Sequence, residues 1–501
     1  MRCAALLATA LLFAGCYDLD GFLRLDGGAD GELEVGLDLG PDSDVGADAD
    51  GADADVGMDG DMGADAMQDE GPPDMARPPP LDERFVLDYA PVGEKTEWLD
   101  AKGAVRLGNM FVVVGRDENN PSGLGRQAIV TGFVPDANES RAVHLGVNSN
   151  QQLLAVTADA TSAHAVGITR DLLGGTTTDG IYYLEIRDDA GEEGRLRIVR
   201  QLAFDSTASN EQAADLIVLD EPGGVKTLAL AGVTNFMPGR DEPMIGVTNL
   251  AAPDGEGVMS TYRFRFDDAE PTERFLGVWA NDEYIVAVGG LNEVNVDRPI
   301  IAVFGRDSLV AWSGRLPNDG RLLDVTLYEG RLIAVGENGS DGIRYTLDLP
   351  VDDTAELRLS HERLPNFALR QVEVVDGVEY YAGIFNGGGA TGRRVDDDVI
   401  VDATGLRIPP LEGDVFQLGP NGFVAASANN ELIVAPTNAE GRVCGSSETT
   451  RFIAAGEEDT LRSCECGTAD CPCRAVQSLS RRGVGYARND ITHDLFDQPC
   501  R

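Results

Sequence analysis

One short pattern recurs along the chain: a polar turn, four mostly apolar residues and then a glycine. The copies end at Gly115, Gly167, Gly232, Gly289, Gly336 and Gly383. A worn copy without the glycine, Phe423-Val424-Ala425-Ala426, follows them. Successive copies lie roughly 50 residues apart, which is typical of a repeat architecture. We therefore expect each copy to be a buried strand of one repeated unit.

The fifth unit shows the expected layout of strands. Val, Ile, Leu, Tyr and Thr alternate with polar residues at 322–328, 331–336, 342–349 and 357–364, which is strand composition. Glu329-Gly330 separates the first two strands as a tight hairpin turn. By the same criteria, third strands are expected at 127–134, 181–187, 243–250, 299–305, 398–403 and 431–436, and fourth strands at 141–147, 196–204, 261–266, 309–316 and 406–411.

The last unit, which starts near Gly413, has no convincing fourth strand. A segment near the N-terminus, Arg84 to Ala90, has the composition of a fourth strand but precedes the first full unit. A ring of repeats must join its two ends, so we expect residues 84–90 to complete the last unit.

The repeats resemble the blades of seven-bladed β-propellers, in the loosest sense the kelch-like ones, with Gly289-Gly290 as the double glycine after an apolar strand. This resemblance implies an all-β fold, a seven-bladed β-propeller of four-stranded blades over residues 84–442. A β-sandwich or a β-helix is the alternative. The resemblance concerns the architecture alone, so it assigns no ligand-binding residues.

The N-terminus has the features of an export signal: Met1-Arg2 and then a short apolar stretch from Ala4 to Ala14. Its end, Phe13-Ala14-Gly15-Cys16, resembles the lipobox of bacterial lipoproteins, with Phe13 in place of the usual Leu. The resemblance implies a signal peptide at 1–15, an acylated Cys16 that carries palmitate-type chains, and anchoring in the lipid bilayer. Tyr17 in place of Asp implies the outer membrane of a Gram-negative bacterium, facing the periplasm or the cell surface. The alternative is an ordinary secretory signal.

Residues 16–83 form an acidic segment built from Asp, Gly, Ala and Pro. Such a composition cannot form a core, so we expect a disordered tether. The spacing of Asp48, Asp50, Asp53 and Asp55 suggests calcium as an alternative, although a closing Glu and flanking helices are missing. We therefore expect no cofactor. The formal net charge of −45 excludes nucleic acid as a partner, because phosphate contacts need Lys and Arg.

Residues 443–501 hold six cysteines, and we expect a small cysteine-rich module there. The cysteines are Cys444, Cys464, Cys466, Cys471, Cys473 and Cys500. An even number outside the cytoplasm favours three disulfides, whose pairing the sequence leaves open. The alternative is a zinc site made of Cys464, Cys466, Cys471 and Cys473. We expect disulfides and no metal.

No catalytic motif is present, and the four histidines lie in different units. If the chain is a propeller, the segments between second and third strands share one rim, including 386–397. Several of them pair Arg with Asp, and loops on a rigid scaffold commonly bind ligands. The ligand-binding candidates are Arg116, Asp117, Arg170, Asp171, Arg240, Asp241, Asp297 and Arg298. Arg there can clamp a carboxylate or sulfate. The alternative is ion pairing between neighbouring blades.

These observations together predict a lipid-anchored β-propeller of the cell envelope that binds a protein, peptide or glycan on one rim. One alternative is an extracytoplasmic polysaccharide hydrolase or lyase with carboxylates in the central channel. Such a pair is set by spatial proximity and has no sequence signature. A second alternative is a purely structural component of the envelope.

Overall fold

The described part of the chain is all-β. The computed structural model describes residues 83–499 except 89–98, 118–126, 135–138, 146–150, 171–178, 189–195, 206–208, 238–239, 253–256, 267–271, 294–295, 309, 317, 351, 353–355, 397, 404–414, 418–421, 429–430, 439, 444–446, 454–456, 462, 466–472, 484–487 and 492–493. These residues belong to one compact unit, Pro78–Arg501. They contain no helix long and apolar enough to cross a membrane. The expected signal peptide, acylated Cys16 and tether lie outside the described residues.

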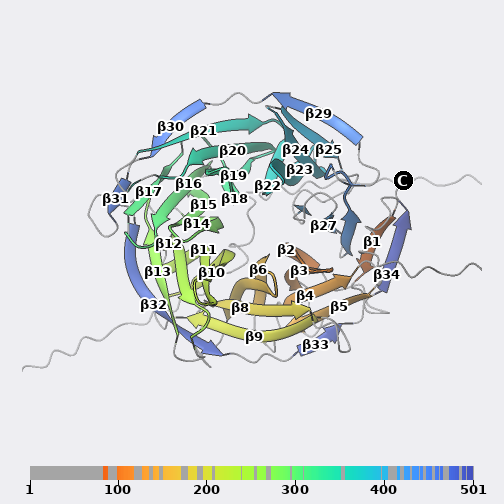
Figure 1. Ribbon diagram of the computed structural model, residues 1–501, viewed down its shortest axis with the longest axis horizontal. Coiled ribbons are helices and arrows are strands. Elements are labelled where there is room, and N and C mark those ends of the chain that lie inside the picture. The colour runs from red at the N-terminus through yellow and green to blue at the C-terminus, as the bar shows by residue number, and fades with distance from the viewer. Residues whose placement is uncertain are drawn as a thin grey trace, which may run out of the picture. The chain divides into compact units, whose positions relative to one another are not determined.

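Groups of four antiparallel strands follow one another along the chain (Figure 1). The first strands are β2 (Leu99–Leu107), β6 (Gln151–Ala158), β10 (Glu211–Glu221), β14 (Thr272–Ala280), β18 (Arg321–Tyr328), β22 (Phe367–Val375) and β26 (Val415–Gln417). The second strands are β3 (Met110–Asp117), β7 (Ala163–Arg170), β11 (Val225–Met237), β15 (Tyr284–Glu293), β19 (Arg331–Asn338), β23 (Val378–Phe385) and β27 (Phe423–Ala428).

The outer strands of each group continue the same order. The third strands are β4 (Gln127–Val134), β8 (Asp179–Asp188), β12 (Arg240–Asn249), β16 (Val296–Gly305), β20 (Asp341–Asp348), β24 (Gly388–Val395) and β28 (Glu431–Pro436). The fourth strands are β5 (Glu139–Leu145), β9 (Leu196–Asp205), β13 (Val258–Phe264), β17 (Val310–Arg315), β21 (Leu357–Leu364) and β25 (Asp398–Ala403).

The sheets are arranged around a ring. Along the chain, each first strand from β2 to β22 contacts the next first strand, and β27 contacts β2 (Figure 1). The strand β1 (Glu83–Asp88) pairs antiparallel with β28, with Phe85 opposite Val434. It supplies the fourth strand to the sheet of β26, β27 and β28, so the two ends of the repeat region meet in one sheet.

The C-terminal segment runs around the outside of this ring, and we call residues 447–499 the belt. Its strands are β29 (Ser447–Ile453), β30 (Glu457–Leu461), β31 (Ser463–Glu465), β32 (Cys473–Gly483), β33 (Arg488–Ile491) and β34 (Asp494–Pro499). They pair in turn with β25, β21, β17, β13 and β9, β5 and β1. The belt therefore passes the sheets in the reverse of their sequence order, as the blue strands of Figure 1 show.

Two sequence-based predictions differ from this arrangement. The prediction of seven separate blades is wrong, because the described strands form six sheets. Strand β32 pairs with both β13 and β9 and so joins two four-stranded groups into one nine-stranded sheet. The described residues do not confirm a separate cysteine-rich module either. In the described residues of 443–501, each strand adds to the edge of a repeat, because a segment with few apolar residues gains more backbone hydrogen bonds there than by itself.

The strands of the sixth group are also shifted from their predicted places. Residues 386–397 were expected to be a loop and 398–403 a third strand, whereas β24 is the third strand and β25 the fourth. Asn386 and Gly387 make a two-residue turn with φ of 51° and 79°, so the glycine-rich stretch begins a strand immediately. The predicted fourth strand, 406–411, lies outside the described residues.

The hydrophobic core consists of layers between neighbouring sheets. In β15, Val286 and Val288 pack toward the sheet of β18–β21, while Ile285 and Ala287 pack toward β11 and β12. Successive side chains of a strand point to opposite faces, so a strand buried on both faces is apolar at every position. This is why the second strands carry apolar quartets and not an alternating pattern.

The glycine after each quartet lies opposite a β-bulge in the first strand. The pairs before the bulge are Ala101 with Gly115, Leu153 with Gly167, Ala213 with Gly232, Phe275 with Gly289, Leu322 with Gly336 and Leu369 with Gly383. A Cβ atom on any of these glycines would lie 1.8–2.1 Å from a carbonyl oxygen of the first strand. No other residue fits, because backbone cannot move aside as a side-chain end does.

Replacing such a glycine tests this contact. We expect Gly336→Ala to lower the free energy of unfolding by about 1–3 kcal/mol or more, because the added Cβ pushes β18 away from β19. Gly314→Ala in β17 is the matched control, since its Cβ would meet only the end of the Leu461 side chain at 2.9 Å. The two variants are compared by denaturant unfolding, and equal losses would contradict the argument.

Candidate functional site

The ring has two rims that differ in their connections. The loop rim is the edge at which second strands end and third strands begin, and the turn rim is the edge at which first strands end and second strands begin. The turns of the turn rim are short, for example Glu329-Gly330 and Asp376-Gly377 with both φ values positive. On the loop rim, residues 118–126 and 171–178 lie outside the described residues.

Two aspartates in the first strands, the strands at the inner edge of the ring, bridge neighbouring sheets. Asp215 and Asp324 each follow a bulge directly. Asp215 Oδ2 accepts a hydrogen bond from the backbone N–H of Val278 in β14 at 2.8 Å, and Asp324 Oδ2 accepts one from Val372 in β22 at 2.8 Å. Each carboxylate thus satisfies an amide that the neighbouring first strand cannot pair within its own sheet.

Burial sets the protonation of these two carboxylates. Burial, together with the charge of Asp324 and against hydrogen bonds from Val278 and Leu216, raises the pKa of Asp215 to about 7. Burial likewise raises the pKa of Asp324 to about 6, against hydrogen bonds from Val372 and Val325. The inner ring therefore carries two carboxyl groups that titrate near neutral pH.

The predicted ligand-binding residues of the first two groups of strands are engaged within the protein. Arg116 is buried, lies 2.9 Å from Asp100 Oδ2 and donates to Gln152 of β6 at 3.0 Å. Arg170 lies 2.9 Å from Asp179 Oδ1. The side chain of Asp117 and all of Asp171 lie outside the described residues.

Asp179 in turn connects the second and third groups of strands. Its Oδ2 accepts a hydrogen bond from Gln212 Nε2 of β10 at 3.1 Å, and its backbone N–H donates to Asn210 Oδ1 at 2.9 Å. Arg116 and Asp179 therefore each belong to a contact that crosses from one group of strands to the next.

The remaining candidates lie around a charged cluster where β12, β14, β16 and β18 begin. Arg240 lies 3.7 Å from Glu242, and Asp241 accepts a hydrogen bond from Asn235 at 3.3 Å. Burial raises the pKa of Asp241, and the charge of Arg274 opposes the rise. Arg298 follows Asp297 at the start of β16, and its side chain is also engaged within the protein.

Arg274, which the sequence analysis did not single out, is the centre of this cluster. Burial lowers the pKa of its guanidinium, as does the charge of Arg321, while Asp241 and Asp297 raise it. Arg321 Nε donates to Glu337 Oε1 at 2.9 Å, and Arg370 lies 3.1 Å from the other oxygen of the same carboxylate. Arginines from three successive first strands, β14, β18 and β22, thus gather near the loop rim.

A second ion-pair network joins the sheets of β18–β21 and β22–β25. Arg344 in β20 binds Glu379 of β23 with two hydrogen bonds of 2.9 and 2.7 Å, and both side chains are buried. Tyr381 donates to Glu379. Arg394 of β24 binds Glu362 of β21 with bonds of 2.8 and 3.0 Å. Such bidentate pairs fix the position of one sheet against the next.

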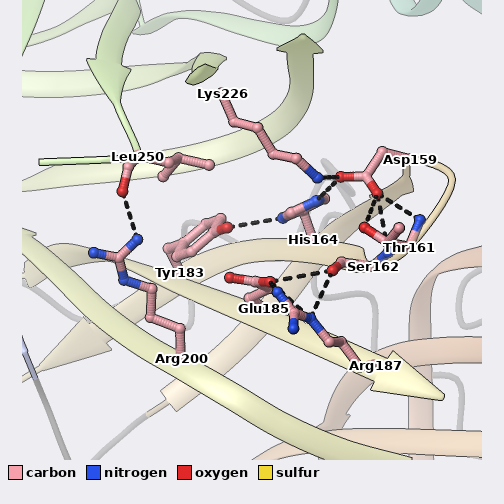
Figure 2. A network of polar contacts seen from close by, with 10 residues as sticks. All are labelled: Asp159, Thr161, Ser162, His164, Tyr183, Glu185, Arg187, Arg200, Lys226 and Leu250. Carbon is pink, nitrogen blue, oxygen red and sulfur yellow. Dashed lines mark hydrogen bonds and ion pairs between the residues drawn. The ribbon is translucent and has the colours of Figure 1, made fainter. Parts of the chain in front are cut away.

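The turn rim holds a separate polar network, drawn in Figure 2. Asp159 accepts hydrogen bonds from the backbone N–H groups of Thr161 and Ser162 at 2.7 and 3.0 Å, which caps the turn before β7. Its other oxygen lies 2.6 Å from His164 Nε2 and binds Lys226 of β11. His164 Nδ1 lies 2.8 Å from the Tyr183 hydroxyl.

Burial sets the protonation of this histidine. Burial lowers the pKa of His164, against the hydrogen bond and charge of Asp159, so the imidazole ring is neutral at neutral pH. Both ring nitrogens of His164 have partners within the protein, Tyr183 and Asp159, as expected of a structural residue. Lys226, one of the few lysines of the chain, connects two groups of strands here.

Two of the predicted disulfide cysteines are described. Cys464 in β31 and Cys473 in β32 are both disulfide-bonded. Cys444, Cys466, Cys471 and Cys500 lie outside the described residues. Among the described residues, no group of three or more His, Cys, Asp or Glu side chains is arranged to hold a metal ion.

Comparison with known proteins gives little information about the function of these residues. No protein-family model matches the chain, and no curated protein is similar to it. Two solved structures of Sqt1 from Chaetomium thermophilum are similar. One has a TM-score of 0.39 and 11% identity over 71% of this chain and 99% of that chain; the other has 0.37 and 11% over 68% and 95%. Such low scores carry no argument, so the propeller assignment follows from the strand pairing.

The titration of Asp215 has a measurable consequence for stability. Because folding raises its pKa, the folded state binds more protons than the unfolded state between pH about 4 and about 7, and stability falls as pH rises through that window. We expect Asp215→Asn to remove part of this fall and to raise the melting temperature at pH 8 relative to the native protein. Asp220→Asn, an exposed change in the same strand, is the control. Identical pH profiles for Asp215→Asn and the native protein would refute the assignment.

Proposed function

We propose that this chain is an exported β-propeller, held by acylated Cys16 at the outer membrane of a Gram-negative cell, that binds a protein, peptide or glycan through its loop rim. The observation that carries the proposal is the use of charged side chains between neighbouring groups of strands. Arg116, Asp179, Arg344 and Arg394 all act in such contacts. A ring cross-linked in this way is a rigid support for the loops of its rim.

The disulfides support the export part of the proposal. Disulfides persist in oxidising compartments such as the periplasm and the cell surface, and they are rare in the cytosol. The chain has two disulfide-bonded cysteines in the described residues. Substituting Cys16→Ala tests the anchor: we expect the variant to move from the membrane fraction to the soluble fraction. If the variant stays with the membrane, the lipid anchor is wrong.

The choice of rim is tested by photo-cross-linking in whole cells. A benzoylphenylalanine at Ser340, in the exposed turn between β19 and β20, probes the loop rim. The same residue at Asp282, in the exposed turn between β14 and β15, probes the turn rim. We expect a defined cross-linked species from Ser340 only, abolished by an excess of the purified protein. Cross-links from Asp282 alone, or from neither position, contradict loop-rim binding.

A polysaccharide hydrolase or lyase is a second candidate, favoured by one observation. Asp215 and Asp324 both carry raised pKa values, and the charge of Asp324 acts on Asp215, as in the carboxylate pair of such an enzyme. Both carboxylates also hold backbone amides of neighbouring sheets, which favours a structural role. Release of new chain ends from anionic polysaccharides by the purified protein, lost in Asp324→Asn, would establish this candidate in place of a scaffold.

A further inference from the structure

The belt covers the fourth strand of every described sheet. Strands β29 to β34 start beside β25 and finish on β1, so the segment makes one lap around the ring. The ladder is continuous where it crosses between two groups: Ser480 of β32 is opposite both Val258 of β13 and Asp205 of β9. A strand that pairs on both sides ties its two neighbours together.

Side chains of the belt also enter the cores between sheets. Leu461 of β30 is 6% exposed and packs in the layer between the sheets of β14–β17 and β18–β21. Cys473 is fully buried and Cys464 half-buried, and both pack on the layer between β11–β13 and β14–β17. The belt is therefore part of the same apolar layers that hold the sheets together.

One buried arginine fixes the belt where it crosses between groups. The side chain of Arg481 is 2% exposed and donates to the carbonyl oxygens of Asn249 at 2.9 Å and Leu250 at 3.2 Å. Its backbone N–H donates to Gly257 at 3.2 Å. Arg200 of β9 donates to the same Leu250 carbonyl and to that of Ala252, so two arginines hold the backbone of Leu250 (Figure 2 shows the contact of Arg200 with Leu250).

These contacts constrain the order in which the strands pair during folding. The belt pairs with edges that exist only after the fourth strands have formed, and its last strand needs β1, which itself pairs with β28. The sulfur atoms of Cys464 and Cys473 reach their places on the core only when β31 and β32 have added to β17 and β13.

We propose that the belt is a lock on the propeller that disulfide formation sets. Strand addition by the belt is reversible while its cysteines are thiols. Oxidation by a disulfide of another molecule converts two belt thiols into one protein disulfide, and the partner leaves as a dithiol carrying the two electrons and two protons. Every cysteine after Cys16 lies in residues 444–500, so such a disulfide closes a loop within the C-terminal segment. The closed loop limits the conformations that a released belt can adopt and thereby favours its pairing with the sheet edges. This lock does not depend on any ligand of the loop rim.

Reduction is expected to reverse the lock without unfolding the repeats. Released belt strands leave β13, β17, β21 and β25 as uncovered sheet edges, whose backbone groups are then free to exchange with solvent or to pair with another chain. The second strands remain buried between sheets, with Val286 and Val335 as examples that have no exposed surface. Loss of protection confined to the belt and to the fourth strands is the signature of a lock.

Hydrogen exchange of the mature full chain tests the proposal in two forms, one oxidised and one reduced with a dithiol and alkylated. On reduction we expect peptides from 457–465 and 473–483 to exchange about tenfold faster or more, while peptides from 331–338 are unchanged. Equal protection of the belt in both forms overturns the proposal. A uniform loss over all strands also overturns it, because the disulfides would then support the whole fold.

The variant Arg481→Met gives an independent test in the oxidised protein. The side chain keeps its approximate length but cannot donate to Asn249 and Leu250, so we expect faster exchange of 473–483 and faster reduction of the belt disulfides by dithiol. Arg358→Met is the matched control, an exposed arginine of β21 opposite Thr460 of the belt. If Arg481→Met reduces no faster than Arg358→Met, the belt does not protect its disulfides and the lock is wrong.

Discussion

Burial of each sheet on both faces is the constraint from which the rest of this molecule follows. A sheet enclosed by two neighbours has no solvent face, so its second strand must be apolar at every position, as at Ile285 to Val288. Any charge that enters such a layer needs a partner, because a buried unpaired charge is costly. Arg344 meets this need with Glu379 across two sheets. Apolar quartets and cross-sheet ion pairs are two results of one packing rule.

Close approach of the first two strands is the second result of that rule. The bulge in each first strand from β2 to β22 turns a carbonyl toward the second strand, and glycine is the residue whose lack of a Cβ leaves room for it. Beyond the bulge, Asp215 and Asp324 use their carboxylates to satisfy backbone amides of the neighbouring sheet. The glycines are therefore required by their own contacts and not only as turn formers.

Much of the strand order could be predicted from the sequence, because turns such as Glu329-Gly330 and runs of branched apolar residues are local signals. The pairing of β1 with β28 followed from a second local signal, a strand-like segment with no repeat of its own. The belt was missed because β29 to β34 pair one by one with distant strands, and nothing in their own composition says where. The Gly387 to Gly389 stretch was misread since glycine favours a loop unless neighbours bury it.

The candidate site was only partly predictable for a similar reason. Arg116, Arg170 and Arg240 stand out in the sequence beside aspartates, but their partners Asp100, Asp179 and Glu242 are set by strand register. Arg274 and Arg321 belong to first strands and carry no motif. A charged residue inside a strand that is otherwise apolar, such as Glu379 before Tyr380 and Tyr381, is the one signal that can identify such residues, because its burial demands a partner.

The sheet that holds β28, β1 and β34 contains both ends of the folded domain. Glu83 is directly opposite Pro499 in the β1–β34 ladder, so a linker of a few residues could join the two ends without moving a strand. The domain is therefore suited to circular permutation, with new ends opened at an exposed two-residue turn such as Glu329-Gly330. The fold of the ring therefore does not depend on the position at which the chain begins.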